Sequence, residues 1–112
     1  MVKIKRAYEK VNKADGFTVL VDRLWPRGIK KIDLHLDEWL KDIGLSNELR
    51  KWFNHDPKKW AGFKQRYFKE LSDKADLIEQ LKSISDKRTL TLLYSAKDEQ
   101  HNQAVALKEY LE

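Results

Sequence analysis

The sequence predicts a small α/β domain in which a short, mostly parallel sheet has helices packed on it. Two runs of mainly apolar and β-branched residues, Phe17 to Val21 and Leu90 to Tyr94, show no polar alternation and are typical of strands that are covered on both faces. Between these runs the apolar residues recur with helical spacing, so the connection is predicted to be a crossover between parallel strands. A chain of 112 residues with 41% hydrophobic residues is sized for one such domain, residues 1–112.

An edge strand is predicted at the beginning of the chain. There Val2, Ile4 and Arg6 alternate with Lys3 and Lys5, a period of two that suits a strand with one exposed, basic face. The next segment, residues 12–16, has the composition of a turn.

Two helical segments are expected directly after the second strand and its loop. Trp39, Leu40 and Ile43 form the first, and Leu49, Trp52 and Phe53 form the next. Ser46 is expected to cap the second of these helices.

The strongest helix signal is Asp56-Pro57, an N-cap acceptor followed by proline at the first helical position. It precedes an apolar stripe formed by Trp60, Phe63, Tyr67 and Leu71. Two further helices are marked by Leu77, Ile78, Leu81 and Ile84, and by Ala104, Val105, Leu107 and Leu111. Asp98 is expected to cap the last helix.

The composition excludes several classes of protein. The chain has no cysteine, so disulfides, thiolate metal sites and a cysteine nucleophile are absent from its chemistry. The first residues lack the apolar core of a signal peptide, and no apolar stretch approaches the ~20 residues that cross a bilayer. We therefore expect a cytoplasmic protein that does not span a membrane.

The net charge of +5 is unevenly distributed along the chain. Residues 1–31 contain nine lysines and arginines and three acidic residues, whereas residues 32–112 contain fourteen and fifteen. Such an N-terminal excess is compatible with an acidic small molecule or with nucleic acid as partner.

The segment from Asp22 to Gly28 is the first candidate site. Arg23 and Arg27 present planar, permanently charged guanidinium groups that suit a phosphate or carboxylate. Pro26 and Gly28 give the loop a defined shape, and Trp25 offers a ring for stacking. The structural alternatives stay open: Arg23 paired with Asp22 or a helix carboxylate, Arg27 solvated, and Trp25 in the core.

A second candidate region lies further along the chain. Arg50 and His55 place a cation and a titratable imidazole close together, and His55 is the best candidate for proton transfer. The alternative is that His55 only closes the preceding helix and that Asp56 is only a cap. Arg66 and Glu70 are four residues apart on one helix and are expected to pair with each other.

The carboxyl ends of parallel strands meet at one edge of a sheet, where ligands bind in open α/β folds. The segments after Val21 and after Tyr94 should therefore converge. This would bring the arginine loop near Lys97, His101 and Asn102. A neutral His101 at the beginning of the last helix could bond a ligand.

Several of these motifs together resemble the YeaO-like branch of domain of unknown function family 488. The resemblance rests on residues 21–28, 48–53, 55–57, 66–67, 70–71 and 91–94, and on His101-Asn102. It implies a small, bacterial-type cytoplasmic α/β domain, and it implies no catalyst, substrate or cofactor. The sequence departs from the family pattern at Gly44-Leu45-Ser46, which concerns the cap of one helix.

Two functional hypotheses follow. The first is a site for a small anionic, phosphorylated or nucleotide-like ligand, with Arg23, Trp25, Arg27, Arg50, Lys97 and Asn102 as contacts and His55 or His101 as acid/base group. The second is a nucleic-acid or protein interaction module that uses the N-terminal basic face, formed by Lys3, Lys5, Lys10 and Lys13. The sequence has no metal-ligand spacing and no dinucleotide fingerprint, and it specifies neither a cofactor nor an oligomeric state.

Overall fold

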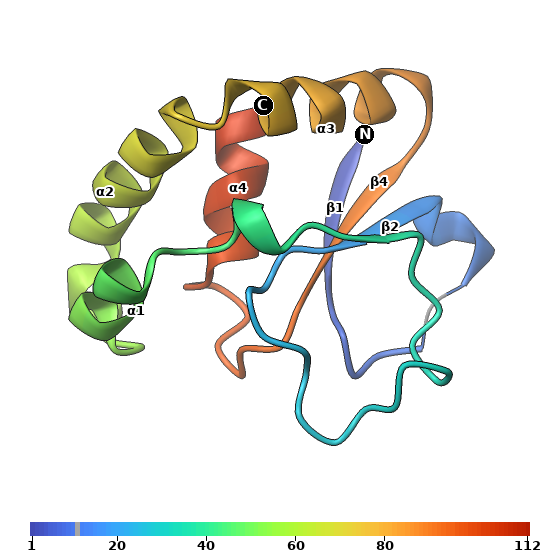
Figure 1. Cartoon of the computed structure of the whole chain (residues 1–112), viewed down its shortest axis with the longest axis horizontal. Helices are drawn as coiled ribbons and strands as arrows, with labels where there is room; N and C mark the ends of the chain where they lie inside the picture. The colour runs from blue at the N-terminus through green and yellow to red at the C-terminus, as the bar shows by residue number, and fades with distance from the viewer. Residues whose placement is uncertain (11) are drawn as a thin grey trace.

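A computed structural model of the chain describes residues 1–10 and 12–112 and shows an α/β fold (Figure 1). Its sheet contains β1 (Val2–Arg6), β2 (Phe17–Leu20), β3 (Glu38–Trp39) and β4 (Leu90–Tyr94). The strand order is β1-β4-β2-β3, and every neighbouring pair is parallel. The predicted fold class is therefore confirmed, and the first strand lies at an edge as the alternation indicated.

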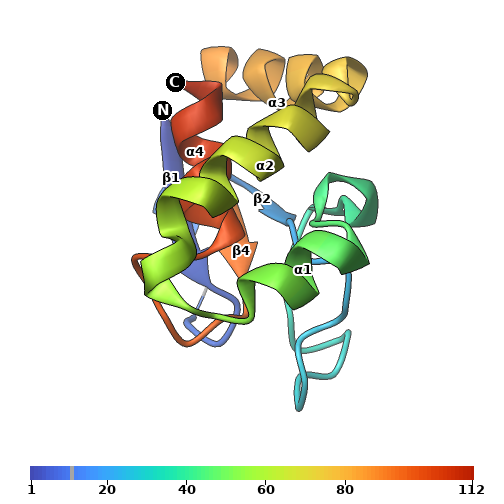
Figure 2. The ribbon, with the colours of Figure 1, turned by 90° about the vertical axis from the view of Figure 1, so that its left-hand side faces the viewer.

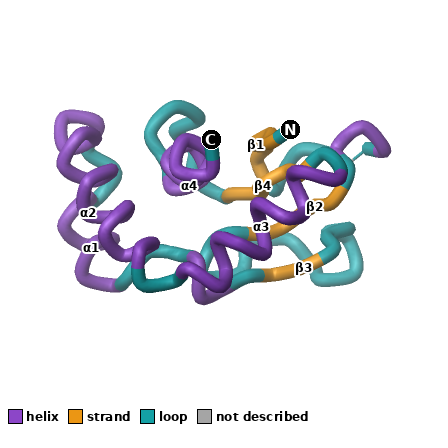
Figure 3. Tube along the Cα trace, turned by 90° about the horizontal axis from the view of Figure 1, so that it is seen from above, coloured by secondary structure: helices purple, strands orange, loops and turns teal. Residues whose placement is uncertain are grey.

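In Figure 3, α1, α2 and α4 lie to one side of the strands, and α3 passes across them in this view. They are α1 (Asn47–Phe53), α2 (Trp60–Ser72), α3 (Ala75–Lys87) and α4 (Gln103–Leu111). Three short 3-10 turns, η1 (Lys13–Asp15), η2 (Lys41–Ile43) and η3 (Pro57–Lys59), complete the regular structure.

Both faces of the sheet are covered, each by a different kind of structure. Val19 of β2 and Leu92 of β4 belong to the main core, to which α2, α3 and α4 contribute their apolar residues. Leu20 and Leu93, on the opposite face, pack against Leu34 in the long loop between β2 and β3. Because both faces of the sheet are covered, the two central strands carry no charged residue, and their two threonines, Thr18 and Thr91, are buried and hydrogen-bonded.

The helical interpretation of Trp39 is wrong. Trp39 lies in β3, where it is in register with Leu20 of β2. Its indole Nε1 donates a hydrogen bond to the Asp22 carbonyl at 2.7 Å, and its ring packs edge-on against Trp25 at a centroid distance of 5.2 Å. A two-residue strand is too short to show periodicity, so contacts with residues distant in sequence decide its conformation.

Two of the predicted helix caps are confirmed. The Ser46 Oγ accepts a hydrogen bond from the Leu49 N–H at 3.1 Å, so the departure from the family pattern at residues 44–46 leaves the cap of α1 intact. The Asp56 carboxylate accepts from the Lys58 N–H at 3.0 Å and begins η3, which leads directly into α2.

The predicted cap of the last helix is wrong. Asn102 caps α4, and its Oδ1 accepts from the Val105 N–H at 3.0 Å. Asp98 instead closes the preceding turn, because one of its carboxylate oxygens accepts from the N–H groups of Gln100 and His101. A carboxylate occupied by its own turn cannot also cap a helix that begins five residues later.

The basic face of β1 is partly neutralised inside the domain. Lys5 and Lys3 reach the buried carboxylate of Asp15 at 2.9 and 3.5 Å, and the Asn12 N–H donates to the same carboxylate at 2.8 Å. Burial by itself would raise the pKa of Asp15, but the hydrogen bond from Asn12 and the two lysines hold that pKa below its ordinary value.

Replacing Asp15 by asparagine is therefore expected to reduce the free energy of unfolding by about 2 kcal/mol at neutral pH. Since the folded-state pKa of Asp15 is lowered, its contribution is present above the ordinary value of 3.8 and is lost as the pH falls through the lower, folded-state value. Urea denaturation of both proteins between pH 7 and pH 3 checks this. A stability difference that does not shrink below pH 4 would contradict the assignment.

Candidate functional site

The carboxyl ends of the central strands converge as predicted. Asp22, which follows β2, accepts hydrogen bonds from the N–H and Oγ of Ser95, which follows β4, at 2.9 and 2.7 Å. Arg6, at the end of β1, donates to the carbonyls of Ser95 and Ala96 at 3.2 and 3.0 Å. Three strand ends are thus joined by polar contacts at one edge of the sheet.

Asp22 is a buried carboxylate at this edge. Burial raises its pKa, and the two hydrogen bonds from Ser95 counteract only part of that effect. Among the described residues, no lysine or arginine nitrogen lies within 4.0 Å of it. The Arg23–Asp22 pair considered from the sequence is therefore not formed, because Ser95 occupies the carboxylate.

A small cleft brings together four of the eight site residues that the sequence indicated. Its polar lining is Arg50, His55, His101 and Asn102, joined by Gln103, and its apolar lining is Leu45, Phe53, Phe63 and Ala96. We call it the α1–α4 cleft, because its polar residues come from α1, the turn after it and the beginning of α4. Its volume of about 30 Å³ is enough for one or two water-sized groups.

The backbone after α1 places His55 at the cleft. Asn54 and His55 have positive φ angles of 45° and 54°, and the Asn54 N–H donates to the Arg50 carbonyl at 3.0 Å. Two consecutive left-handed residues end the helix and turn the chain back. This conformation is unfavourable for a residue with a Cβ, so the site keeps His55 in a strained position.

His101 is oriented by its own loop. Its Nδ1 lies 3.0 Å from a carboxylate oxygen of Asp98, and its ring meets the edge of Trp60 at a centroid distance of 5.3 Å. The hydrogen bonds of the Gln100 N–H and of His101 hold the pKa of Asp98 below its ordinary value, so Asp98 is an anion at neutral pH. An Nδ1–H that donates to Asp98 leaves Nε2 for another partner.

Asn102 is buried, and both ends of its amide already have partners. Its Nδ2 donates to the Asp98 carbonyl at 2.8 Å, and its Oδ1 caps α4. Its established contribution is to join the loop to the helix, and contact with a ligand stays a prediction for this residue.

None of the three residues predicted for the arginine loop, Arg23, Trp25 and Arg27, lines the cleft. Trp25 is half-buried and packs against the apolar cluster of Leu20, Leu34 and Leu93, and its Nε1 donates to the Ile29 carbonyl at 2.6 Å. Arg23 is exposed and donates to the Leu45 carbonyl at 3.3 Å, rather than to the helix carboxylate considered from the sequence.

Arg27 and Lys97, the remaining two predicted contacts, are both exposed. The Arg27 carbonyl accepts from the Tyr8 hydroxyl at 2.9 Å, and the neighbouring Gly28 has the positive φ, 84°, that its place in the loop indicated. Lys97 follows Ala96, which lines the cleft, but is not itself part of the lining.

The expected pair between Arg66 and Glu70 is not formed. Glu70 accepts from the N–H and Oγ of Ser46 at 3.0 and 2.5 Å, and so fastens the beginning of α1 to α2. The Arg66 guanidinium carbon instead lies 3.9 Å from the ring centroid of Trp52. Glu70 therefore bonds to Ser46 and Arg66 packs on Trp52, because an exposed ion pair between Arg66 and Glu70 would contribute little to the free energy of folding.

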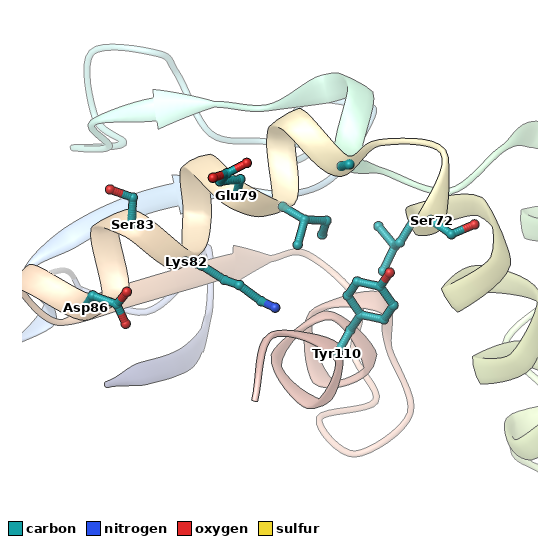
Figure 4. Close-up of a pocket in the computed structure, with 9 residues that line it drawn as sticks. Ser72, Glu79, Lys82, Ser83, Asp86 and Tyr110 are labelled. Atoms are coloured by element: carbon teal, nitrogen blue, oxygen red, sulfur yellow. The ribbon is translucent and has the colours of Figure 1, made fainter.

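Two larger grooves lie elsewhere. One of about 560 Å³ separates α3 from Tyr110 of α4, with Glu79, Lys82 and Asp86 around it (Figure 4). Another of about 310 Å³ lies between the segment after β1 and residues 29–35. Neither contains any of the eight residues predicted for the small-anion site, although Lys10 of the N-terminal basic face lines the second. We therefore place the candidate site at the smaller cleft, where four of those eight residues meet.

In the part of the chain that the structure describes, no helix is both long and apolar enough to cross a membrane. Within the same residues, no three histidine, aspartate or glutamate side chains gather in an arrangement that could hold a metal ion.

The family described as the inactive DUF488-N3 subclade matches residues 1–112, and the chain belongs to it. Its relatives are similar in length and align with nearly the whole chain. The uncharacterized protein YeaO of Escherichia coli (strain K12) is 46% identical over 98% of this chain and 96% of its own length. The uncharacterized proteins Mb3100c of Mycobacterium bovis and Rv3073c of Mycobacterium tuberculosis are each 37% identical, over 98% of this chain and 92% of their own. No solved structure matches the chain.

Proposed function

We propose that the protein binds a small anionic ligand in the α1–α4 cleft, with Arg50 and His101 as principal contacts and His55 as a further polar partner. The observation that supports this is that four residues singled out from separate sequence motifs line a single cavity at the beginning of α4. The proposal concerns binding, because the family is described as inactive. The acid/base role considered for His55 or His101 stays a prediction, as does the cytoplasmic location.

The size of the cleft indicates what enters it. A volume of about 30 Å³ does not hold a nucleotide or a sugar, but it holds one or two oxygens of a phosphate or carboxylate. The remainder of a larger ligand would lie outside, where Arg50 is exposed. Arg50 has no carboxylate within 4.0 Å among the described residues, and the N-terminus of α4 favours negative charge. The negative charge of Asp98 opposes the binding of an anion, but its carboxylate accepts hydrogen bonds from the Gln100 and His101 N–H groups of its own turn.

The arginine loop and the N-terminal basic face receive less support. Arg23, Trp25 and Arg27 do not line the cleft, although Arg23 contacts the carbonyl of a residue that does. On the N-terminal face, Lys3 and Lys5 already pair with Asp15, which leaves Lys10 and Lys13 exposed. A nucleic-acid or protein partner on that face therefore stays the alternative hypothesis.

Ligand binding can be tested by thermal shift and calorimetry at low salt, with inorganic phosphate, nucleotides and sugar phosphates as probes. At about 100 times its dissociation constant a ligand adds ~2.7 kcal/mol, which raises the melting temperature by several degrees in a domain of this size. Arg50→Ala is expected to weaken binding about tenfold or more, because a hydrogen bond to a charged group is lost.

Arg27→Ala is the matched control, since it removes an exposed arginine that lies outside the cleft. It is expected to leave the affinity unchanged. If Arg27→Ala abolished binding while Arg50→Ala had no effect, the site would be the arginine loop. If no small anion bound at all, the proposal would fail.

A further inference from the structure

The hairpin formed by α1, η3 and α2, residues 47–72, has a net charge of +4, and the segment between its acidic ends carries more positive charge than the whole chain. Residues 49–69 contain seven lysines and arginines and one aspartate, a net charge of +6. The other 91 residues contain sixteen basic and seventeen acidic residues, a net charge of −1. The hairpin forms one end of the molecule and faces the viewer in Figure 2.

Most of these cations are not paired within the domain. In the described part of the chain, Lys64 is the one member of the seven with a carboxylate within 4.0 Å, that of Glu109 at 3.2 Å. Lys51, Lys58 and Lys69 are exposed. Glu48, at the beginning of α1, is exposed beside them, and Asp56 is occupied as the cap of η3. The field around the hairpin is therefore positive and suits a polyanion.

An aromatic ring lies among these cations. The half-buried indole of Trp52 rests on α2 above Gly62, where an added Cβ would come within 3.0 Å of the ring. The guanidinium of Arg66 lies 3.9 Å from the ring centroid and the Lys59 ammonium 5.2 Å from it. Trp52 thereby holds Arg66 in place while the arginine side chain stays exposed. Aromatic rings and guanidinium planes are the surfaces on which unpaired bases stack.

We propose that this hairpin is a binding surface for single-stranded nucleic acid, with Lys51, Lys58 and Lys69 contacting phosphates and Arg66 with Trp52 offering a stacking platform. Acidic protein segments would satisfy the charge but would not use the stacking surface, so the combination favours nucleic acid. The surface differs from the N-terminal basic face and from the α1–α4 cleft, because none of these five residues belongs to either.

The test is fluorescence anisotropy with a labelled single-stranded oligonucleotide of mixed sequence, over a range of salt concentrations. Affinity should fall with salt, with a log–log slope of about −0.7 for each phosphate neutralised. The triple variant Lys51→Gln, Lys58→Gln, Lys69→Gln should make that slope shallower by up to about 2, and Arg66→Ala should weaken binding roughly tenfold.

The matched control is Lys10→Gln, Lys13→Gln, Lys30→Gln, which removes the same charge from exposed positions elsewhere. It should bind nearly as well as the original protein. Equal losses in the two triple variants, equal binding of poly-glutamate, preference for a duplex, or no binding at low salt would each overturn the proposal. Circular dichroism of each variant establishes that it is folded. Because the lysine variant retains Arg50 and His101, its binding of small anions separates this proposal from the proposed function.

Discussion

Replacing Gly16 by alanine is expected to reduce the free energy of unfolding by about 3 kcal/mol or more. Two effects add at this position. Gly16 has φ 64° and ψ −129°, a conformation that residues with a Cβ rarely adopt. An added Cβ would also lie 2.3 Å from the Thr89 carbonyl oxygen, which already accepts the Phe17 N–H at 2.9 Å. The Thr89 carbonyl and the Phe17 N–H belong to the backbone that sets the β2–β4 register, so neither group can move away from the added Cβ at low cost.

Gly28→Ala is the control that separates strain from collision. Gly28 has a positive φ of 84°, but an added Cβ would meet nothing within 4 Å. We expect it to cost about 1 to 2 kcal/mol, from backbone strain alone. Urea denaturation of both variants measures the difference. Equal costs would show that the contact with Thr89 contributes nothing.

Replacing Phe63 by alanine is the second large effect, with an expected loss of about 3 to 5 kcal/mol in the free energy of unfolding. Phe63 is fully buried at the centre of an aromatic group in which its ring lies 4.3 Å from Phe53, 5.4 Å from Trp60 and 5.8 Å from Tyr67, between centroids. Because Phe63 also lines the α1–α4 cleft, its truncation enlarges that cleft and removes the contacts that join α1 to α2.

Phe68→Ala gives the comparison for Phe63. Phe68 is only half-buried on the same helix and contacts Tyr110 at a centroid distance of 5.2 Å, so its truncation should cost clearly less. Chemical denaturation of both variants tests the ranking. A Phe63→Ala protein as stable as Phe68→Ala would refute the view that this aromatic group is the centre of the core.

The parts of the fold that could be predicted are those in which local pattern and tertiary environment agree. The runs at residues 17–21 and 90–94 identified the two central strands because both faces of each strand are covered. Asp56-Pro57 located a helix beginning because its hydrogen bond is local. The helix predicted at Trp39 was wrong because the conformation of this residue depends on Leu20, Trp25 and Asp22, which are distant in sequence.

The convergence of the strand ends near the candidate site could be predicted from the sequence, but the side chains that line the cleft could not. Convergence of the segments after β2 and β4 follows from parallel topology, and Ser95 bonded to Asp22 confirms it. Which side chains enter a cleft depends on competition among polar groups: Ser46 takes Glu70 from Arg66, and the Asp98 turn takes its carboxylate from α4. The spacing of residues along the chain does not show which of two competing hydrogen-bond partners a carboxylate takes.

The charge of the hairpin, in contrast, is readable from the sequence. Residues 32–112 are nearly neutral as a whole, because the basic segment 49–69 is balanced there by acidic residues on either side of it. Without residues 1–31 and 49–69, the rest holds seven basic and fourteen acidic residues. A finer window along the chain shows two basic segments instead of one N-terminal excess.

The place of β4 in the sheet has a consequence for how the protein folds during synthesis. β4 lies between β1 and β2, and β1 has no other strand partner: Val2 is in register with Leu90, and Phe17 with the same residue. Before residues 90–94 leave the ribosome, the emerging chain can form only the short β2–β3 pairing. The pairing of β4 with β1 and β2 joins residues that are distant in sequence, which slows folding. Until it forms, the apolar residues of β1 and β2 stay exposed. The nascent chain therefore depends on residues 90–112, its last fifth, and a product truncated before Leu90 should remain unfolded and prone to aggregate.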